Sequence, residues 1–268
     1  MTPGKRSLWL RPVLAGAAAL AARHPVSRAG FSFTLQTLAR SGKHRLYLAG
    51  YLALGVALAA VVASSAAATS TAAHPNLAPG LMALQMTLVF ALVAGLRSVV
   101  EIPAELRSNW VFRTCWNGDI RRYVMGVRRA FVLGIVTPLL ALLMPLHVFW
   151  WGWGLALRHA AIDLLAALVL LEAALVGFRK LPFTCSYLPK GTFKFLWPAY
   201  LVAFFASTYL LATIERPALA GDEALLRLAA GLVLAVAALR LYARWRLVKK
   251  PEVVFEEAAD PAAVALGL

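Results

Sequence analysis

The chain has 268 residues, of which 61% are hydrophobic and only 15% are charged, and its mean hydropathy is +0.73. A soluble domain is about half apolar and about a quarter charged, so this composition argues against a soluble enzyme, a disordered chain or a disulfide-stapled secreted domain. The 27 Lys and Arg residues exceed the 12 Asp and Glu residues, which gives a net charge of +15. Such an excess is typical either of a nucleic-acid partner or of the inner face of a membrane.

Six apolar segments are predicted to cross a bilayer as helices, each of which needs about 20 residues. In chain order they are residues 46–66, 81–96, 130–150, 160–178, 195–214 and 224–242. The second is short, and it spans the bilayer if it begins near Pro79 and if Arg97 reaches the interface. An earlier apolar segment, residues 8–22, contains Arg11, so we expect an interfacial or cytosolic helix there.

The cationic residues fall almost entirely on one side of this topology. Residues 1–45, 97–129, 179–194 and 240–250 hold 24 of the 27 Lys and Arg residues, whereas Arg158, Arg216 and Arg227 fall on the other side. Because basic loops stay in the cytoplasm, both termini are predicted to be cytoplasmic. Contact with anionic lipid then accounts for the charge, and no nucleic-acid partner is expected.

These patterns predict an all-α fold, a polytopic membrane helix bundle with six transmembrane helices and interfacial amphipathic helices. Residues 1–45 form a basic cytoplasmic or interfacial segment, residues 46–242 the membrane domain and residues 243–268 a cytoplasmic tail. Cys115 and Cys185 fall in predicted cytoplasmic loops, where thiols stay reduced. We predict no metal ligands, cofactor or catalytic motif, because the sequence lacks a CxxC, a His-Glu-x-x-His and a Gly-x-Ser-x-Gly.

Two cytoplasmic segments have an amphipathic pattern. In residues 30–45, Phe31, Leu35 and Leu38 recur at helical spacing ahead of a basic cluster. In the loop after the second span, Asp119 is a predicted helix N-cap, and one apolar face follows it. Two interpretations of this second helix stay open, docking of a cytoplasmic partner or contact with lipid headgroups. The apolar face consists of Ile120, Val124, Val127 and Phe131, and the candidate docking residues are Asp119, Arg121, Arg122, Arg128 and Arg129.

The fourth predicted span carries two carboxylates, Asp163 and Glu172. A charged side chain costs about 2.5–3.5 kcal/mol at the bilayer centre, so both are candidate functional residues. Nine residues separate them, which places them on opposite faces of a helix. His159 precedes Asp163 by one turn, and His147 ends the third span nearby.

Two interpretations of these residues stay open. His147, His159 and Asp163 form a proton or substrate relay, or Asp163 lies near the outer interface and pairs with His159 or Arg158. For Glu172 we expect an inner-face cation such as Arg179 as partner. A separate aromatic cluster, predicted to be an interfacial belt at the end of the third span, comprises Phe149, Trp150, Trp151 and Trp153.

Six spans, cytoplasmic termini and amphipathic helices before span one and between spans two and three resemble the ABC-2-type exporter permeases. The runs Glu-Leu-Arg-Ser-Asn-Trp-Val-Phe-Arg (105–113) and Lys-Leu-Pro-Phe-Thr-Cys-Ser-Tyr-Leu-Pro (180–189) also resemble segments of uncharacterised bacterial multi-pass proteins labelled permease-like. The resemblance implies a connecting helix over residues 31–45 and a coupling helix over residues 119–129 that docks a separate ATPase. It also implies the bacterial inner membrane and a substrate path between the spans of two copies, hence a homodimer.

One feature departs from that family, whose re-entrant helices between spans five and six have no room in the loop at residues 215–223. The function that the resemblance implies is an integral membrane permease-like subunit, energised by a separate ATPase. The alternative is a membrane-embedded enzyme or a lipid-handling protein that uses Glu172 or the His159/Asp163 pair.

Overall fold

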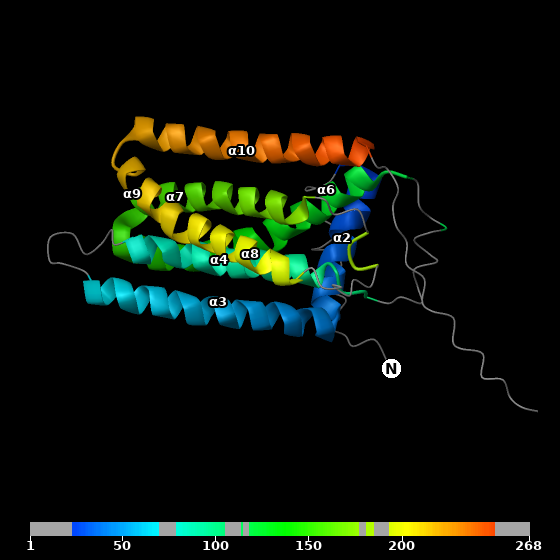
Figure 1. Cartoon of the computed structure of the whole chain (residues 1–268), viewed down its shortest axis with the longest axis horizontal. Coiled ribbons are helices and arrows are strands. Elements are labelled where there is room, and N and C mark those ends of the chain that lie inside the picture. The colour runs from blue at the N-terminus through cyan, green and yellow to red at the C-terminus, as the bar shows by residue number, and fades with distance from the viewer. Residues whose placement is uncertain are drawn as a thin grey trace, which may run out of the picture.

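The structure is a computed structural model that describes residues 23–69, 79–104, 114, 118–176, 181–184 and 193–249. These residues form helices and no strand, which confirms the all-α prediction. In chain order the helices are α2 (Pro25–Arg40), α3 (Gly42–Thr69), α4 (Pro79–Val99), α6 (Ile120–Phe131), the π-helical turn η3 (Val132–Val136), α7 (Thr137–Leu175), α8 (Phe193–Phe205), the π-helical turn η4 (Ala206–Leu210), α9 (Leu211–Ala218) and α10 (Asp222–Lys249) (Figure 1).

Five helical stretches in the described residues are long and apolar enough to cross a membrane: Gly42–Ser64, Gly80–Val99, Ile120–Leu175, Pro198–Ala218 and Asp222–Arg246. The stretch on α4 is 67% buried inside the bundle, whereas the stretch on α10 is only 6% buried. Helix α4 is therefore the centre of the bundle, and α10 exposes apolar side chains over most of its surface. Apolar surface of this extent is typical of contact with lipid and indicates a multi-pass membrane protein.

Helix α7 is two antiparallel arms joined at Gly152, whose φ of 76° and ψ of 168° are not helical. The ring centroids of His147 and His159 lie 5.0 Å apart, although 12 residues of continuous helix would rise about 18 Å. At the other end of the arms, Arg128 of α6 forms an ion pair with Glu172. The chain therefore turns back at Gly152, and the two parts of α7 correspond to the third and fourth predicted spans. When these two parts are counted separately, the described residues form six long apolar arms.

The turn at Gly152 gives a first testable prediction. Its φ and ψ lie in a region that only glycine occupies without strain, so Gly152→Ala is expected to lower the free energy of unfolding by about 1–3 kcal/mol. Gly154 is the matched control, because a Cβ there meets nothing within 4 Å and its φ is not positive. Thermal unfolding of both variants in detergent checks this, and an equal effect at the two positions would contradict it.

Small residues allow α3 to pack closely against α4. A Cβ built on Gly55 would lie 2.6 Å from that of Ala91, and one on Gly95 would lie 2.9 Å from that of Tyr51. The hydroxyl groups of Tyr51 and Ser98 share a hydrogen bond of 2.8 Å across the same interface. Close backbone approach of this kind is what holds helices together where lipid removes the hydrophobic driving force.

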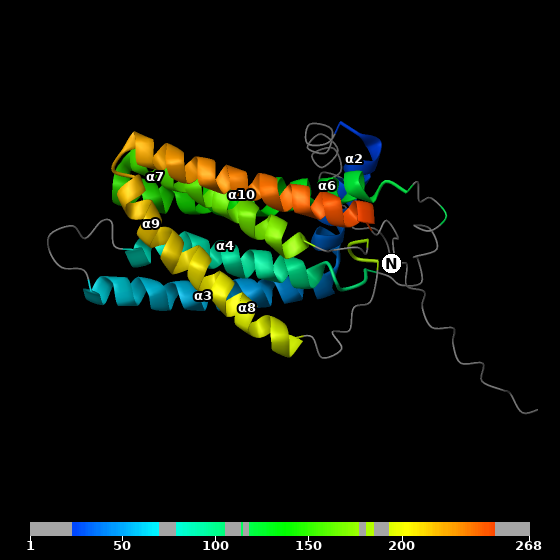
Figure 2. The same ribbon diagram turned by 45° about the horizontal axis from the view of Figure 1, so that its top comes forward.

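The two ends of the bundle differ in charge. Helices α2 and α6 lie at the end where α3 begins and α10 finishes, and α9 lies at the opposite end (Figures 1 and 2). The described residues 40–45, 97, 121–129 and 240–246 bring their cations to the first end. Arg158, Arg216 and Arg227 lie at the second end, where Arg158 is paired with Asp222 at 2.7 Å. The predicted segregation of charge thus coincides with the two ends of one bundle.

Several predicted boundaries need correction. The amphipathic helix expected from residue 30 to residue 45 is α2, which begins at Pro25 after the N-cap His24 and ends at Arg40. The fifth apolar arm continues to Ala218, so Glu215 is helical and does not lie in a loop. The first membrane helix begins at Gly42, and α10 continues to Lys249, beyond the predicted end at residue 242. Residues 8–22, 105–113, Cys115, Arg179 and Cys185 lie outside the described residues.

Candidate intramembrane site

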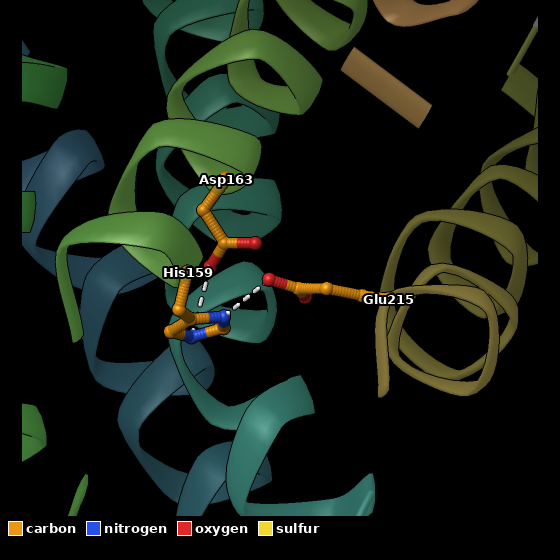
Figure 3. A group of neighbouring side chains, drawn as sticks. All are labelled: His159, Asp163 and Glu215. Atoms are coloured by element: carbon orange, nitrogen blue, oxygen red, sulfur yellow. Dashed lines mark hydrogen bonds and ion pairs between the residues drawn. The ribbon is translucent and has the colours of Figure 1, made fainter. Parts of the chain in front are cut away.

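His159, Asp163 and Glu215 meet inside the bundle, and all three side chains are buried, with at most 1% exposed (Figure 3). His159 and Asp163 lie one turn apart on the second arm of α7, and Glu215 faces them from α9. The imidazole lies between the two carboxylates. Its Nδ1 is 2.8 Å from Oε1 of Glu215 and its Nε2 is 3.5 Å from Oδ2 of Asp163.

Helix α9 positions Glu215 through its own hydrophobic pattern. Leu211, Ala212 and Ala218 are buried together with Glu215, and these positions share one face of a helix. Because that face packs into the bundle, the carboxylate of Glu215 points inward, to the level of His159. The hydrogen bond with His159 then satisfies a group that would otherwise be costly to bury.

His147 and Trp151, from the first arm of α7, line the same site. The ring of His147 is stacked on that of Trp151 at a centroid distance of 5.1 Å and an angle of 5°, and it meets the ring of His159 edge-on. Trp151 also meets His159 edge-on at 5.1 Å. Trp151 therefore lines the site, which corrects the prediction that it belongs to an interfacial belt. Phe149 and Trp153 are 84% and 66% exposed and fit that belt.

Several buried polar atoms around His159 have no hydrogen-bond partner among the described residues. They are both ring nitrogens of His147, together with Nε2 of His159 and Oδ2 of Asp163, which face each other at 3.5 Å. Gln85 comes from the centre of α4 and lies next to Asp163. Each such group costs about 1–3 kcal/mol when it is buried without a partner, so their concentration at one place is a feature of the site and not of ordinary packing.

Glu172 belongs to a second, separate polar cluster. Its carboxylate is 2% exposed and lies 3.1 Å from Nη1 of Arg128 and 2.8 Å from Nε of Arg240. As the nine-residue spacing predicts, it faces away from Asp163, toward α6 and α10. The prediction expected an inner-face cation and named Arg179 as an example, which lies outside the described residues; the inner-face cations that the structure shows beside Glu172 are Arg128 and Arg240. The cluster ties the amphipathic helix α6 to two membrane arms.

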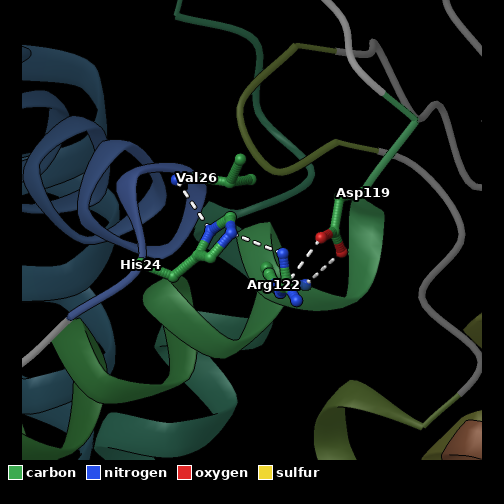
Figure 4. A network of polar contacts seen from close by, with 4 residues as sticks. All are labelled: His24, Val26, Asp119 and Arg122. Atoms are coloured by element: carbon green, nitrogen blue, oxygen red, sulfur yellow. Dashed lines mark hydrogen bonds and ion pairs between the residues drawn. The ribbon is translucent and has the colours of Figure 1, made fainter.

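The candidate docking residues on α6 divide into inward and outward groups. Asp119 caps the helix, since its side chain accepts a hydrogen bond of 3.0 Å from the backbone N–H of Arg122. The guanidinium group of Arg122 is paired with Asp119 and with the ring of His24, at the start of α2 (Figure 4). Arg128 is turned inward to Glu172, and Arg129 is half-buried. Arg121 and Arg122 are exposed, and the predicted apolar face of α6 is buried.

Comparison of the chain with protein-family models, curated proteins and solved structures finds no match. Of the residues at this site, His147, His159 and Asp163 were predicted from the sequence, whereas Glu215, Gln85 and Trp151 were not. The buried position of Glu215 could have been predicted from the spacing of Leu211, Ala212 and Ala218, which continues the apolar face of the fifth span past residue 214. For Gln85 the signal was an amide inside an apolar run, which is unusual in a membrane helix.

Proposed function

We propose that the chain is a permease-like subunit of a membrane transporter in the bacterial inner membrane. The observation that supports it is the cluster of His159, Asp163 and Glu215, fully buried between apolar helical arms. Ionisable residues at such positions are expensive and are typical of substrate paths, ion paths and proton relays.

The proposed orientation places both termini in the cytoplasm. The bundle end that carries α2, α6 and the end of α10 is the basic one, and basic segments are retained on the cytoplasmic side. His159 and Glu215 then lie toward the outer side, near the turn at Gly152 and the end of α9.

A separate ATPase is proposed to act on α6. The outward Arg121 and Arg122 offer a basic surface, and the sequence contains no Gly-x4-Gly-Lys motif for binding a nucleotide itself. Movement of α6 reaches the membrane arms through the Arg128–Glu172–Arg240 cluster, since Glu172 and Asp163 belong to the same arm of α7. The proposal requires two copies of the chain around the substrate path.

A groove of about 470 Å³ between the second arm of α7 and α10 favours a second candidate function, lipid handling. Its walls are aliphatic, and Arg244 provides a cation beside Arg240, which is paired with Glu172, so the groove suits an anionic amphiphile. The aliphatic lining comprises Leu165, Leu168, Val233, Val236, Ala237 and Leu241. Loss of co-purified anionic lipid in Arg244→Ala, with an unchanged set of protein partners, would favour this candidate over the permease.

Labelling of the two native cysteines tests the orientation. We expect a membrane-impermeant maleimide to leave Cys115 and Cys185 unmodified in intact cells and to modify them after permeabilisation. Ala220→Cys, in the exposed turn between α9 and α10 of an otherwise cysteine-free chain, is expected to react from outside. Modification of Cys115 in intact cells would overturn the six-span topology.

Affinity purification of the tagged protein in mild detergent tests the partner. An ATPase subunit is expected to co-purify with the wild-type chain and to be lost when Arg121→Glu and Arg122→Glu are combined. Arg246→Glu, at the same end of the bundle but on α10, is the matched control and should retain the subunit. Recovery of the wild-type chain without any ATPase would contradict the ATPase-coupled function.

A further inference from the structure

We propose that the cluster around His159 binds a divalent transition-metal cation of the Zn²⁺ class. His159 and Asp163 are the ligands, Glu215 orients His159, and the buried side chains of His147 and Gln85 line the site. This site goes beyond the proposed transport function and stands whether or not an ATPase docks on α6.

The first ground is the arrangement of lone pairs. Nε2 of His159 and Oδ2 of Asp163 lie 3.5 Å apart, and neither atom has a hydrogen-bond partner in the described part of the chain. Zinc binds nitrogen and oxygen at about 2.0–2.2 Å in tetrahedral geometry, which separates two ligand atoms by about 3.3 Å. The observed spacing therefore suits two ligands of one ion.

The second ground is the hydrogen bond on the far side of the imidazole. Nδ1 of His159 is 2.8 Å from Oε1 of Glu215, and both side chains are fully buried. A metal-bound histidine almost always donates its other N–H to a carboxylate, which fixes the tautomer and directs the free nitrogen to the ion. Glu215 supplies this carboxylate, and ligand atoms of all three residues lie within 4.8 Å of one another.

Further polar side chains are buried around the two ligands. His147 is 0% exposed, both of its nitrogens lack a hydrogen bond among the described residues, and its ring centroid is 5.0 Å from that of His159. Gln85, also 0% exposed, places its amide beside Asp163. Imidazole and carboxylate donors suit zinc and its neighbours in the first transition row, and a single ion would satisfy Nε2 of His159 and Oδ2 of Asp163 at once.

Charge supports the same occupant. The ion pairs of Asp163 and Glu215 in the described residues are with His159 alone, and Arg158 is engaged with Asp222. Two carboxylates buried among apolar helices are costly without a compensating charge. A divalent cation with neutral imidazoles and two carboxylates gives a site of zero net charge.

Metal analysis of the full-length protein tests the proposal. The chain is purified in mild detergent, stripped with a chelator, incubated with Zn²⁺, desalted and assayed by mass spectrometry, with a result of about one zinc per chain expected. His159→Ala and Asp163→Asn should abolish this binding. Glu215→Gln, which removes only the orienting carboxylate, should weaken it by about 10–100-fold.

Two variants serve as controls. Glu172→Gln removes a buried carboxylate from the same arm, and Asp222→Asn removes an exposed one from the same end of the bundle, so both should keep the zinc. If a ligand variant does not fold, ligand-field absorption of Co²⁺ bound to the wild-type chain gives the answer. A folded wild-type chain with neither bound zinc nor such absorption overturns the site, and its cluster is then a proton-sharing one. Equal retention of zinc in all variants overturns it as well.

Discussion

Replacement of Glu172 by alanine is expected to lower the free energy of unfolding by about 3–5 kcal/mol. The carboxylate is 2% exposed and forms ion pairs with Arg128 and Arg240, which come from two other helices. Removal of one member leaves the side chain of Arg128, which is 20% exposed, without its opposite charge. The variant should also loosen α6 from the membrane arms, because Arg128 is the contact of α6 with this cluster.

Unfolding of the purified protein in detergent, followed by circular dichroism, measures this effect. The matched control is Glu223→Ala, which breaks the pair of Glu223 and Arg227 on the surface of α10, where the two side chains are 85% and 73% exposed. An exposed pair of this kind contributes about 0–1 kcal/mol. Equal losses in the two variants would show that the Glu172 cluster does not hold the helices together.

The whole cluster can also be replaced by apolar residues. A chain with Arg128→Met, Glu172→Leu and Arg240→Leu is expected to regain most of the stability lost in Glu172→Ala, since an ionic cluster around a buried carboxylate is often no more stabilising than apolar packing. Transport activity should not return with it if the cluster transmits movement from α6. Recovery of both stability and transport would show that the charges are not needed for coupling.

Local sequence patterns predicted much of this fold. The apolar runs, the cap at Asp119 and the buried face of α6 all depend on residues within one or two helical turns of each other. The structure shows the cap, the buried face and five long apolar stretches, one of which is divided at Gly152. The opposite directions of Asp163 and Glu172 follow in the same way from a spacing within one helix. Such features are fixed by helix geometry alone, so they need no knowledge of how helices pack.

The contacts that make the candidate site are different, because they join distant parts of the chain. His159 and Glu215 are 56 residues apart, and Glu172 and Arg240 are 68 residues apart. Which face of one helix meets which face of another is decided by packing, and the sequence offered several equally suitable cations for Glu172. Trp151 was misplaced for a related reason, since the turn at Gly152 directs it inward while its neighbour Trp153 stays exposed.

Helices α2 and α6 form a layer at the basic end, and their backbones touch at two glycines. A Cβ on Gly126 would overlap the carbonyl oxygen of Ser27 and lie 2.9 Å from the amide nitrogen of Phe31, and a Cβ on Gly30 would overlap the carbonyl oxygen of Tyr123. These obstacles are backbone atoms, which cannot turn aside as a flexible side chain does. A side chain at position 126 therefore forces the two helices apart.

Gly126→Leu is accordingly expected to destabilise the protein by about 3 kcal/mol and to detach α2 from α6. Trypsin cleavage at the exposed Arg28 and Arg40 of α2 measures the detachment, and its rate should rise relative to the wild-type chain. Gly231→Leu, at an exposed position of α10 where a Cβ meets nothing within 4 Å, should leave both stability and cleavage nearly unchanged. If α6 is the site at which an ATPase acts, Gly126→Leu should also reduce ATPase co-purification, because the layer that presents Arg121 and Arg122 is then no longer rigid. Unchanged cleavage of α2 in Gly126→Leu would show that the two helices do not depend on this contact.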